Sequence, residues 1–304
     1  MHTLTIASRE SALAMWQAEH IRDRLRALHP GCTVNILGMT TRGDQILDVT
    51  LSKIGGKGLF VKELEIALEA GQADLAVHSM KDMPTLQPAG LLLDCYLPRE
   101  DVRDAFVSPA VARLADLPQG AVVGSSSLRR RAQLKSRRPD LQVVEFRGNV
   151  QTRMKKLADG VATATFLAMA GLNRLGMAQV ARSAIAPEEM LPAVAQGAIG
   201  IERRADDSRA ETMLASIHHT ETGERLAAER AFLAALDGSC ETPIAGLATL
   251  EGGTIRLRGE ILRPDGSEVI TGEARAPITD AATMGADLAR QLLAQAPKGF
   301  FDWC

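Results

Sequence analysis

Apolar and polar positions alternate in a strand-helix rhythm over the first third of the chain. Short apolar runs predict strands, and an apolar stripe at helical spacing predicts a helix after the long polar stretch 40–58. The predicted elements, in chain order, are a strand at 4–8, a helix at 12–28, a strand at 33–39, a helix at 60–70 and a strand at 74–79.

The middle of the chain repeats this rhythm. An apolar run at 91–98 is followed by strands at 121–125, 141–146 and 162–168, with helices at 127–137 and 150–157. Such alternation is typical of a parallel sheet with helices on both faces, so we expect two α/β lobes with a cleft between them. Ligands of such sheets bind beyond the carboxyl ends of the strands. Those ends carry Ser8-Arg9, His78-Ser79, Gly124-Ser125 and Arg147-Gly148.

The last third changes character. Three alternating runs predict a small antiparallel sheet, and a turn signal, RPDG at 263–266, separates the last two. We therefore expect a separate α+β domain. The elements predicted in this third of the chain are helices at 206–217, 222–236 and 279–295 and strands at 244–250, 254–262 and 268–276.

Composition sets the broad class of protein. The chain has 304 residues, 46% hydrophobic and 24% charged, which is typical of a globular protein of two or three domains. The four cysteines lack the spacing of a zinc site, and we expect no metal. Because the N-terminus lacks the pattern of a signal peptide and no apolar run could span a membrane, we expect a soluble, cytoplasmic protein.

Charge is distributed unevenly. The formal net charge is −2, which excludes a polycation that binds nucleic acid or lipid as a whole, but ten basic residues stand against two acidic ones between residues 117 and 156. Arg129 and Arg130 follow a strand and three serines, which predicts an anion pocket at a helix N-terminus. For Arg137 and Arg138, at a helix end, a solvated face is the simpler reading. Nucleic acid is a rival ligand, although stacking rings are scarce here.

The segment HSMKDMP at 78–84 places several reactive side chains directly after a strand. Asp82 is a candidate acid, base or cation stabiliser, and the alternative is an aspartate that forms a turn before Pro84. Cys240 lies in a Gly-Ser-Cys turn, where a chemical role competes with that of a small packed residue.

Two glycine-rich segments do not match nucleotide-binding motifs. GGKG at 55–58 lacks the serine or threonine that follows the lysine of a phosphate loop, so Lys53 and Lys57 are assigned to a flap. QGAIGIE at 196–202 lacks the dinucleotide fingerprint, and no hydride cofactor is indicated.

Taken together, nine segments resemble the porphobilinogen deaminase family, also called the hydroxymethylbilane synthases, over essentially the whole chain. Several long motifs in one order make a chance resemblance improbable. The segments are IASRESALAMWQA (6–18), GGKGLFVKELE (55–65), DLAVHSMKDMP (74–84), REDVRDAF (99–106), VGSSSLRRRAQL (123–134), FRGNVQTR (146–153), LAMAGLNRL (167–175), PAVAQGAIGIE (192–202) and GSCETPIA (238–245).

The resemblance implies a transferase of tetrapyrrole (haem) biosynthesis. Family enzymes condense four porphobilinogen molecules head to tail with release of ammonia, and then free hydroxymethylbilane by hydrolysis. They carry a dipyrromethane cofactor, made from substrate and held by a cysteine thioether, and Cys240 is the matching residue. Asp82 matches the catalytic aspartate, which hydrogen-bonds pyrrole N–H groups and stabilises the cationic azafulvene left when ammonia departs.

The fold implied by the resemblance is α/β, with two periplasmic-binding-protein-like (type II) lobes and a small α+β C-terminal domain. Residues 1–98 and 197–217 would form lobe 1, residues 99–196 lobe 2, and residues 218–304 the third domain. Each porphobilinogen carries an acetate and a propionate, so cations must line the site. Residues that match cofactor-binding positions are Lys81, Asp82, Ser125, Ser127, Arg129, Arg130 and Cys240. Residues that match substrate-binding positions are Arg9, Ser11, Lys53, Lys57, Phe60, Ser79, Arg147, Arg153, Arg174 and Gln196.

Two positions depart from the family pattern. Ala195 stands where glycine is usual, and Thr163 stands where aspartate is common. The resemblance further implies a monomer whose partner is the small molecule porphobilinogen, without nucleic acid or membrane. The alternative is a two-lobed protein that binds an organic anion without turnover.

Overall fold

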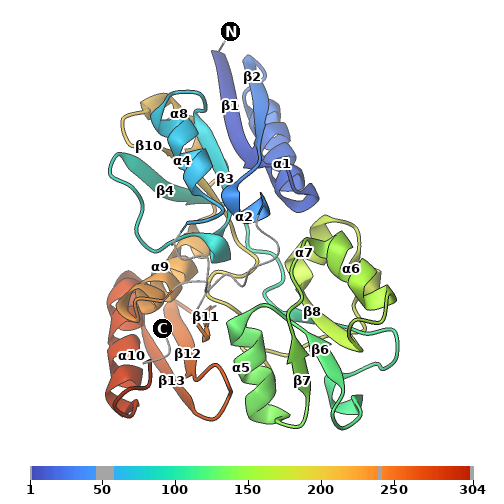
Figure 1. Ribbon diagram of the computed structural model, residues 1–304. Helices are drawn as coiled ribbons and strands as arrows, with labels where there is room; N and C mark the ends of the chain where they lie inside the picture. Colours follow the sequence, from blue (N-terminus) through green and yellow to red (C-terminus); the bar gives the residue numbers. More distant parts are fainter. Residues whose placement is uncertain (1, 46–57, 239–241, 302–304) are drawn as a thin grey trace. The chain divides into compact units, whose positions relative to one another are not determined.

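The computed structural model describes residues 2–45, 58–238 and 242–301. These residues form two compact units (Figure 1). The first contains residues 2–45, 58–100 and 197–223, and the second contains the others. The chain therefore leaves the first unit after residue 100, returns to it at residue 197 and leaves it again after residue 223. The three-domain boundaries given above stay a prediction.

The first unit is built on a five-stranded sheet in the order β2-β1-β3-β10-β4. β1 pairs in parallel with both β2 and β3, whereas β10 runs antiparallel between β3 and β4. The strands are β1 (His2–Arg9), β2 (Cys32–Met39), β3 (Leu75–Ser79), β4 (Leu91–Tyr96) and β10 (Ile199–Arg204).

Helices bury both faces of this sheet. Ile21 and Leu25 of α1 pack with Met213 of α8 against one face, and Leu64 and Leu68 of α4 pack against the other. The first predicted helix has the expected bounds, because Ser11 accepts a hydrogen bond from the amide of Ala14 and so caps its first turn. The helices are α1 (Ala12–Leu28), α2 (Arg42–Gln45), α4 (Lys62–Glu69) and α8 (Ser208–Ala215), with the 3-10 turn η1 (Met80–Asp82) after β3.

The second unit contains a sheet of the same plan, in the order β7-β6-β8-β5-β9. Three strands are again parallel and the fourth place is again taken by an antiparallel strand, β5. The strands are β5 (Asp104–Val107), β6 (Val122–Gly124), β7 (Gln142–Val144), β8 (Ala164–Ala168) and β9 (Ser183–Ala184). The helices are α5 (Leu128–Arg137), α6 (Val150–Ala158) and α7 (Met169–Arg174), with 3-10 turns η2 (Leu114–Asp116) and η3 (Ala178–Val180).

The second unit also contains the predicted α+β domain. Its antiparallel sheet has the order β11-β12-β13, and helices α9 and α10 cover it (Figure 1). The helices pack closely because Gly285 of α10 lies against the backbone of α9, where an added Cβ would stand 2.2 Å from the carbonyl oxygen of Ala228. The elements are α9 (Thr220–Ala235), β11 (Ile244–Glu251), β12 (Thr254–Leu262), β13 (Val269–Pro277), η4 (Ile278–Asp280) and α10 (Ala281–Gln295).

The α/β fold class is confirmed: two α/β sheets of the same plan and a small α+β domain. The prediction of parallel sheets was wrong in one respect, because each sheet is mixed. The antiparallel strands β5 and β10 carry buried charged residues, Asp104 in one and Glu202 and Arg203 in the other. Because charged residues interrupt their apolar runs, the sequence pattern did not predict either strand.

The turn before β10 contains a strained residue. Ala195 has φ +62°, in the left-handed region that L-residues other than glycine rarely adopt. Its side chain is buried, and its amide donates a 2.6 Å hydrogen bond to Oε2 of Glu229, which holds this geometry in place. This is the position where the family pattern has glycine.

We expect Ala195→Gly to stabilise the protein by about 0.5–1 kcal/mol, because relief of the left-handed strain exceeds the extra chain entropy of glycine. Ala198→Gly is the matched control: Ala198 is also buried and is not among the left-handed residues, so its replacement should lower stability. Denaturant unfolding of both variants measures the difference. A loss of stability in Ala195→Gly would contradict the strain argument.

Candidate functional site

The carboxyl end of β3 presents the residues of the HSMKDMP segment. His78 is buried, and its Nε2 lies 2.9 Å from Oε2 of Glu202 on β10. Ser79 lies on the opposite face of the strand, where its Oγ accepts a 3.0 Å hydrogen bond from Gln17 of α1. His78 and Ser79 are therefore already engaged inside the first unit.

The turn η1 holds Lys81 and Asp82 beyond the end of β3. The buried Met80 anchors it, since its amide donates to the carbonyl of Ala198 and its sulfur packs against Gly200. Asp82 is partly exposed, and its carboxylate has no hydrogen-bond or ion-pair partner within the described part of the chain. The alternative role for Asp82, a turn-forming aspartate, would need the amide two residues on, and Pro84 has none.

A second group of the first unit surrounds Arg9, the last residue of β1. Its guanidinium carbon lies 4.4 Å from the centre of the Phe60 ring, and its Nε donates a 3.0 Å hydrogen bond to Asp44. Thr41 also donates to Asp44, at 2.7 Å. Burial opposes ionisation of Asp44, but the bonds from Arg9 and Thr41 outweigh it and hold its pKa below the ordinary value. The structure thus brings Arg9 and Phe60 together, with Asp44 as a partner that the sequence did not reveal.

In the second unit, the serines before α5 form its N-terminus. The hydroxyl of Ser127 accepts from the amide of Arg130 and caps the helix, while Ser125 is buried at the end of β6. Arg129 and Arg130 are also buried, with about 5% of each residue exposed. The structure therefore places the predicted serines and arginines around one helix start.

Both arginines share one carboxylate that sequence reasoning missed. Nη1 of Arg129 donates to Oδ2 of Asp104 at 2.7 Å, and Nη2 of Arg130 donates to Oδ1 at 2.7 Å. Gln196 adds a third bond, from Nε2 to Oδ1 at 2.9 Å. Asp104 lies 25 residues earlier in the chain than Arg129 and neutralises one of the two positive charges. Asp104 does belong to the REDVRDAF segment, one of the nine segments that carry the family resemblance.

Asp104 is ionised despite its complete burial. Burial by itself would raise the pKa of this carboxyl, but the charges of Arg129 and Arg130 and their hydrogen bonds reverse the effect and hold the pKa well below its ordinary value. The two guanidinium groups and the carboxylate together keep one net positive charge at neutral pH.

The remaining predicted arginines of the second unit lie on and before its other helices. Arg147 precedes Gly148, and Nε of Arg153 on α6 donates to the Gly148 carbonyl at 2.9 Å. Arg174 is the last residue of α7. All three are partly exposed, so they differ from the buried Arg129 and Arg130.

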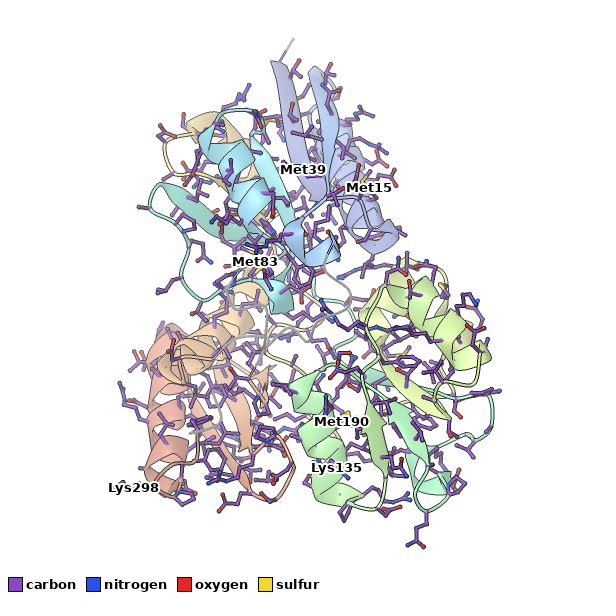
Figure 2. All side chains as sticks on the ribbon, in the orientation of Figure 1. Met15, Met39, Met83, Lys135, Met190 and Lys298 are labelled. Atoms are coloured by element: carbon purple, nitrogen blue, oxygen red, sulfur yellow. The ribbon has the colours of Figure 1, made fainter. Side chains whose placement is uncertain are left out.

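Acidic side chains pair with several other basic residues of the segment between 117 and 156, and backbone carbonyls accept hydrogen bonds from another. Arg131 pairs with Glu145, Arg138 with Asp140, and Lys155 with Asp159. Lys135, labelled in Figure 2, donates to the carbonyls of Pro139 and Leu141 at 3.0 and 2.8 Å. The excess seen in the sequence is therefore concentrated on fewer groups.

The predicted residues Lys53, Lys57 and Cys240 lie outside the described residues. Of the cysteines that are described, Cys95 is buried in the core of the first unit, and burial raises the pKa of its thiol to about 12. Cys32 is partly exposed. A thiol that stays protonated is a poor nucleophile, so Cys95 is not suited to covalent chemistry.

Comparison with known families covers nearly the whole chain. A family model described as "Porphobilinogen deaminase, dipyromethane cofactor binding domain" matches residues 4–212, and one described as "Porphobilinogen deaminase, C-terminal domain" matches residues 224–294. The chain belongs to the porphobilinogen deaminase family. Membership in the porphobilinogen deaminases makes it a transferase of tetrapyrrole biosynthesis with a dipyrromethane cofactor, and the alternative of an anion-binding protein without turnover is not favoured.

Relatives named porphobilinogen deaminase align over almost their full length. The relative from Paracoccus denitrificans is 65% identical over 302 residues, which are 99% of this chain and 96% of the relative. The relative from Thiobacillus denitrificans is 57% identical over 99% of both chains, and that from Chromobacterium violaceum is 56% identical over 96% and 95%. Among solved structures, a putative methionine-binding lipoprotein from Bacillus subtilis aligns with a TM-score of 0.44 at 11% identity, over 72% of this chain and 92% of that chain.

Among the described helices of this family member, none is long and apolar enough to cross a membrane.

Proposed function

We propose that this chain is a hydroxymethylbilane synthase that joins four porphobilinogen molecules head to tail and releases ammonia at each addition. The growing chain would be attached to a dipyrromethane held by a thioether to Cys240, and hydrolysis would free the product. The observation that carries the proposal is the match to both family domains, together with buried guanidinium groups at the helix start where the family binds carboxylates.

The residues of the second unit fit such a cofactor. Nε of Arg129 is buried and has no hydrogen-bond acceptor within the described residues. A buried donor without an acceptor is rare in a complete structure, and a ligand carboxylate is the acceptor that suits a guanidinium best. Arg129, Arg130, Ser125 and Ser127 would hold the cofactor, which supplies a nucleophilic pyrrole carbon on which the product grows.

Residues of the first unit would handle the incoming substrate. Arg9 would bind a carboxylate of porphobilinogen, and Phe60 would keep the Arg9 guanidinium in place through its ring face. The carboxylate of Asp82 has no hydrogen-bond partner among residues 2–45, 58–238 and 242–301, so it can accept a hydrogen bond from a pyrrole N–H and stabilise the positive charge that develops as ammonia leaves. Ser11, Ser79 and Gln196 are bonded inside the protein, and we assign them a supporting role.

Turnover of porphobilinogen tests the proposal directly. The purified chain is incubated with porphobilinogen, and both ammonia and hydroxymethylbilane are measured over time. We expect one product for every four ammonias, repeated over many cycles per protein molecule. Binding of porphobilinogen without its consumption would overturn the proposal and favour an anion-binding protein.

We further propose that the enzyme acts as a monomer in the cytoplasm, as the family resemblance implies. Light scattering coupled to size-exclusion chromatography tests the oligomeric state. A mass near 32.5 kDa is expected, and a stable dimer of twice that mass would contradict it.

A further inference from the structure

The side chain of Asp104 joins parts of the second unit that lie far apart in the sequence. It is the first residue of β5, and its side chain is fully buried. Its two oxygens receive hydrogen bonds from Arg129 and Arg130 of α5 and from Gln196. Gln196 also donates to the carbonyl of Val102 at 2.8 Å. One carboxylate therefore fixes the start of α5 against both ends of the segment 101–196.

Each guanidinium is held by more than this ion pair. Nε and Nη2 of Arg130 donate hydrogen bonds to Asp104, and its Nη1 donates to the carbonyl of Phe166 at 2.9 Å. Arg129 directs Nη1 to Asp104 and to the carbonyl of Leu191 at 3.0 Å. The planes of both groups are therefore set before any ligand arrives, which is the condition for bidentate recognition without rearrangement.

The arrangement fixes the arginines but does not saturate them. Nε of Arg129 remains a buried donor without an acceptor within the described residues. Glu260 is a second carboxylate near this cluster. It forms an ion pair with Arg137 at 3.7 Å and accepts a hydrogen bond from Gln133, so its charge is balanced by Arg137 and not by Arg129 or Arg130. Most buried donors in proteins have an acceptor, whereas this cluster keeps a donor without one among the described residues and one positive charge.

We infer that Asp104 is a positioning residue for the cofactor: it holds Arg129 and Arg130 in the geometry that receives a carboxylate and reduces their charge to what one carboxylate neutralises. This inference rests on the proposed function, since it assigns the ligand of the arginines to the dipyrromethane. Asp104 would act only through the two guanidinium groups and would not touch the cofactor itself.

Assembly of the cofactor on the protein measures this role. Wild-type protein and Asp104→Asn are freed of pyrroles, supplied with porphobilinogen, and followed by intact-mass spectrometry as the adduct forms. We expect Asp104→Asn to need about tenfold more porphobilinogen for half-maximal loading, because its arginines are no longer held. Charge alone predicts the opposite, since the variant leaves two uncompensated cations that would attract carboxylates more strongly.

Leu141→Ala separates positioning from general damage. Leu141 is fully buried in the core of the same lobe, and neither Arg129 nor Arg130 belongs to its hydrophobic cluster, so the variant loses stability but its folded fraction should load like the wild type. If Asp104→Asn does not fold, Asp104→Glu is tested instead. It keeps the negative charge that pairs with the buried arginines, but its side chain is longer by one methylene and shifts the two guanidinium groups. Loading of Asp104→Asn or Asp104→Glu at wild-type concentrations would overturn the inference. Failure of the wild type to load at all would instead overturn the proposed function.

Discussion

We expect Cys240→Ala to be isolated without any pyrrole adduct and with activity at background. Only a thiolate at this position can form the proposed thioether, and the alanine methyl group cannot. Intact-mass spectrometry of the purified wild type should show the sequence mass plus two pyrrole units, and the variant should show the sequence mass alone, even after incubation with porphobilinogen.

Cys32→Ala is the matched control for this experiment. Cys32 is the partly exposed thiol among the described cysteines, so it tests whether any accessible thiol can be loaded. The control should keep the full adduct and wild-type activity. An adduct that persists in Cys240→Ala and is lost in Cys32→Ala would place the attachment elsewhere.

Asp82→Asn should lower kcat by about 100- to 10,000-fold while porphobilinogen still binds with similar affinity. The amide keeps the size of the side chain and can still accept a hydrogen bond, but it lacks the negative charge that opposes the cation formed as ammonia leaves. An effect confined to kcat is the signature of an interaction made in the transition state. Steady-state kinetics, together with binding measured on loaded protein, gives both quantities.

Two further variants serve as controls for this prediction. Asp82→Glu keeps the charge and should retain more activity than Asp82→Asn. Asp23→Asn removes an exposed carboxylate on α1 whose partner is the neighbouring Arg22, and it should leave kcat unchanged. Turnover by Asp82→Asn within a few-fold of the wild type would remove Asp82 from the chemistry.

Local signals in the sequence predicted the helices and the parallel strands well. The caps Ser11 and Ser127 and the apolar stripes are local features, so α1 and α5 begin near the expected residues. The antiparallel strands β5 and β10 are different, because their charged side chains are neutralised by partners far along the chain. Glu202 is hydrogen-bonded to His78, which lies 124 residues away in the sequence, and no pattern within either strand predicts that contact.

The candidate site shows the same limit. The sequence motifs pointed to Arg9, Arg129 and Arg130 as site residues, but not to the carboxylates that hold them. Asp44 and Asp104 are separated from their arginines by 35 and 25 residues respectively. The composition gives the number of acidic residues, but only the structure shows which arginine each of them pairs with.

The place of β10 in the first sheet has a consequence for biosynthesis. This strand lies between β3 and β4 but is translated more than 100 residues after them, whereas the strands of the second α/β sheet all lie within residues 104–184. The second sheet can therefore close while the nascent chain is still on the ribosome. The N-terminal sheet must wait with two open strand edges until residue 204 has emerged, which makes it the part of the newborn protein most in need of a chaperone.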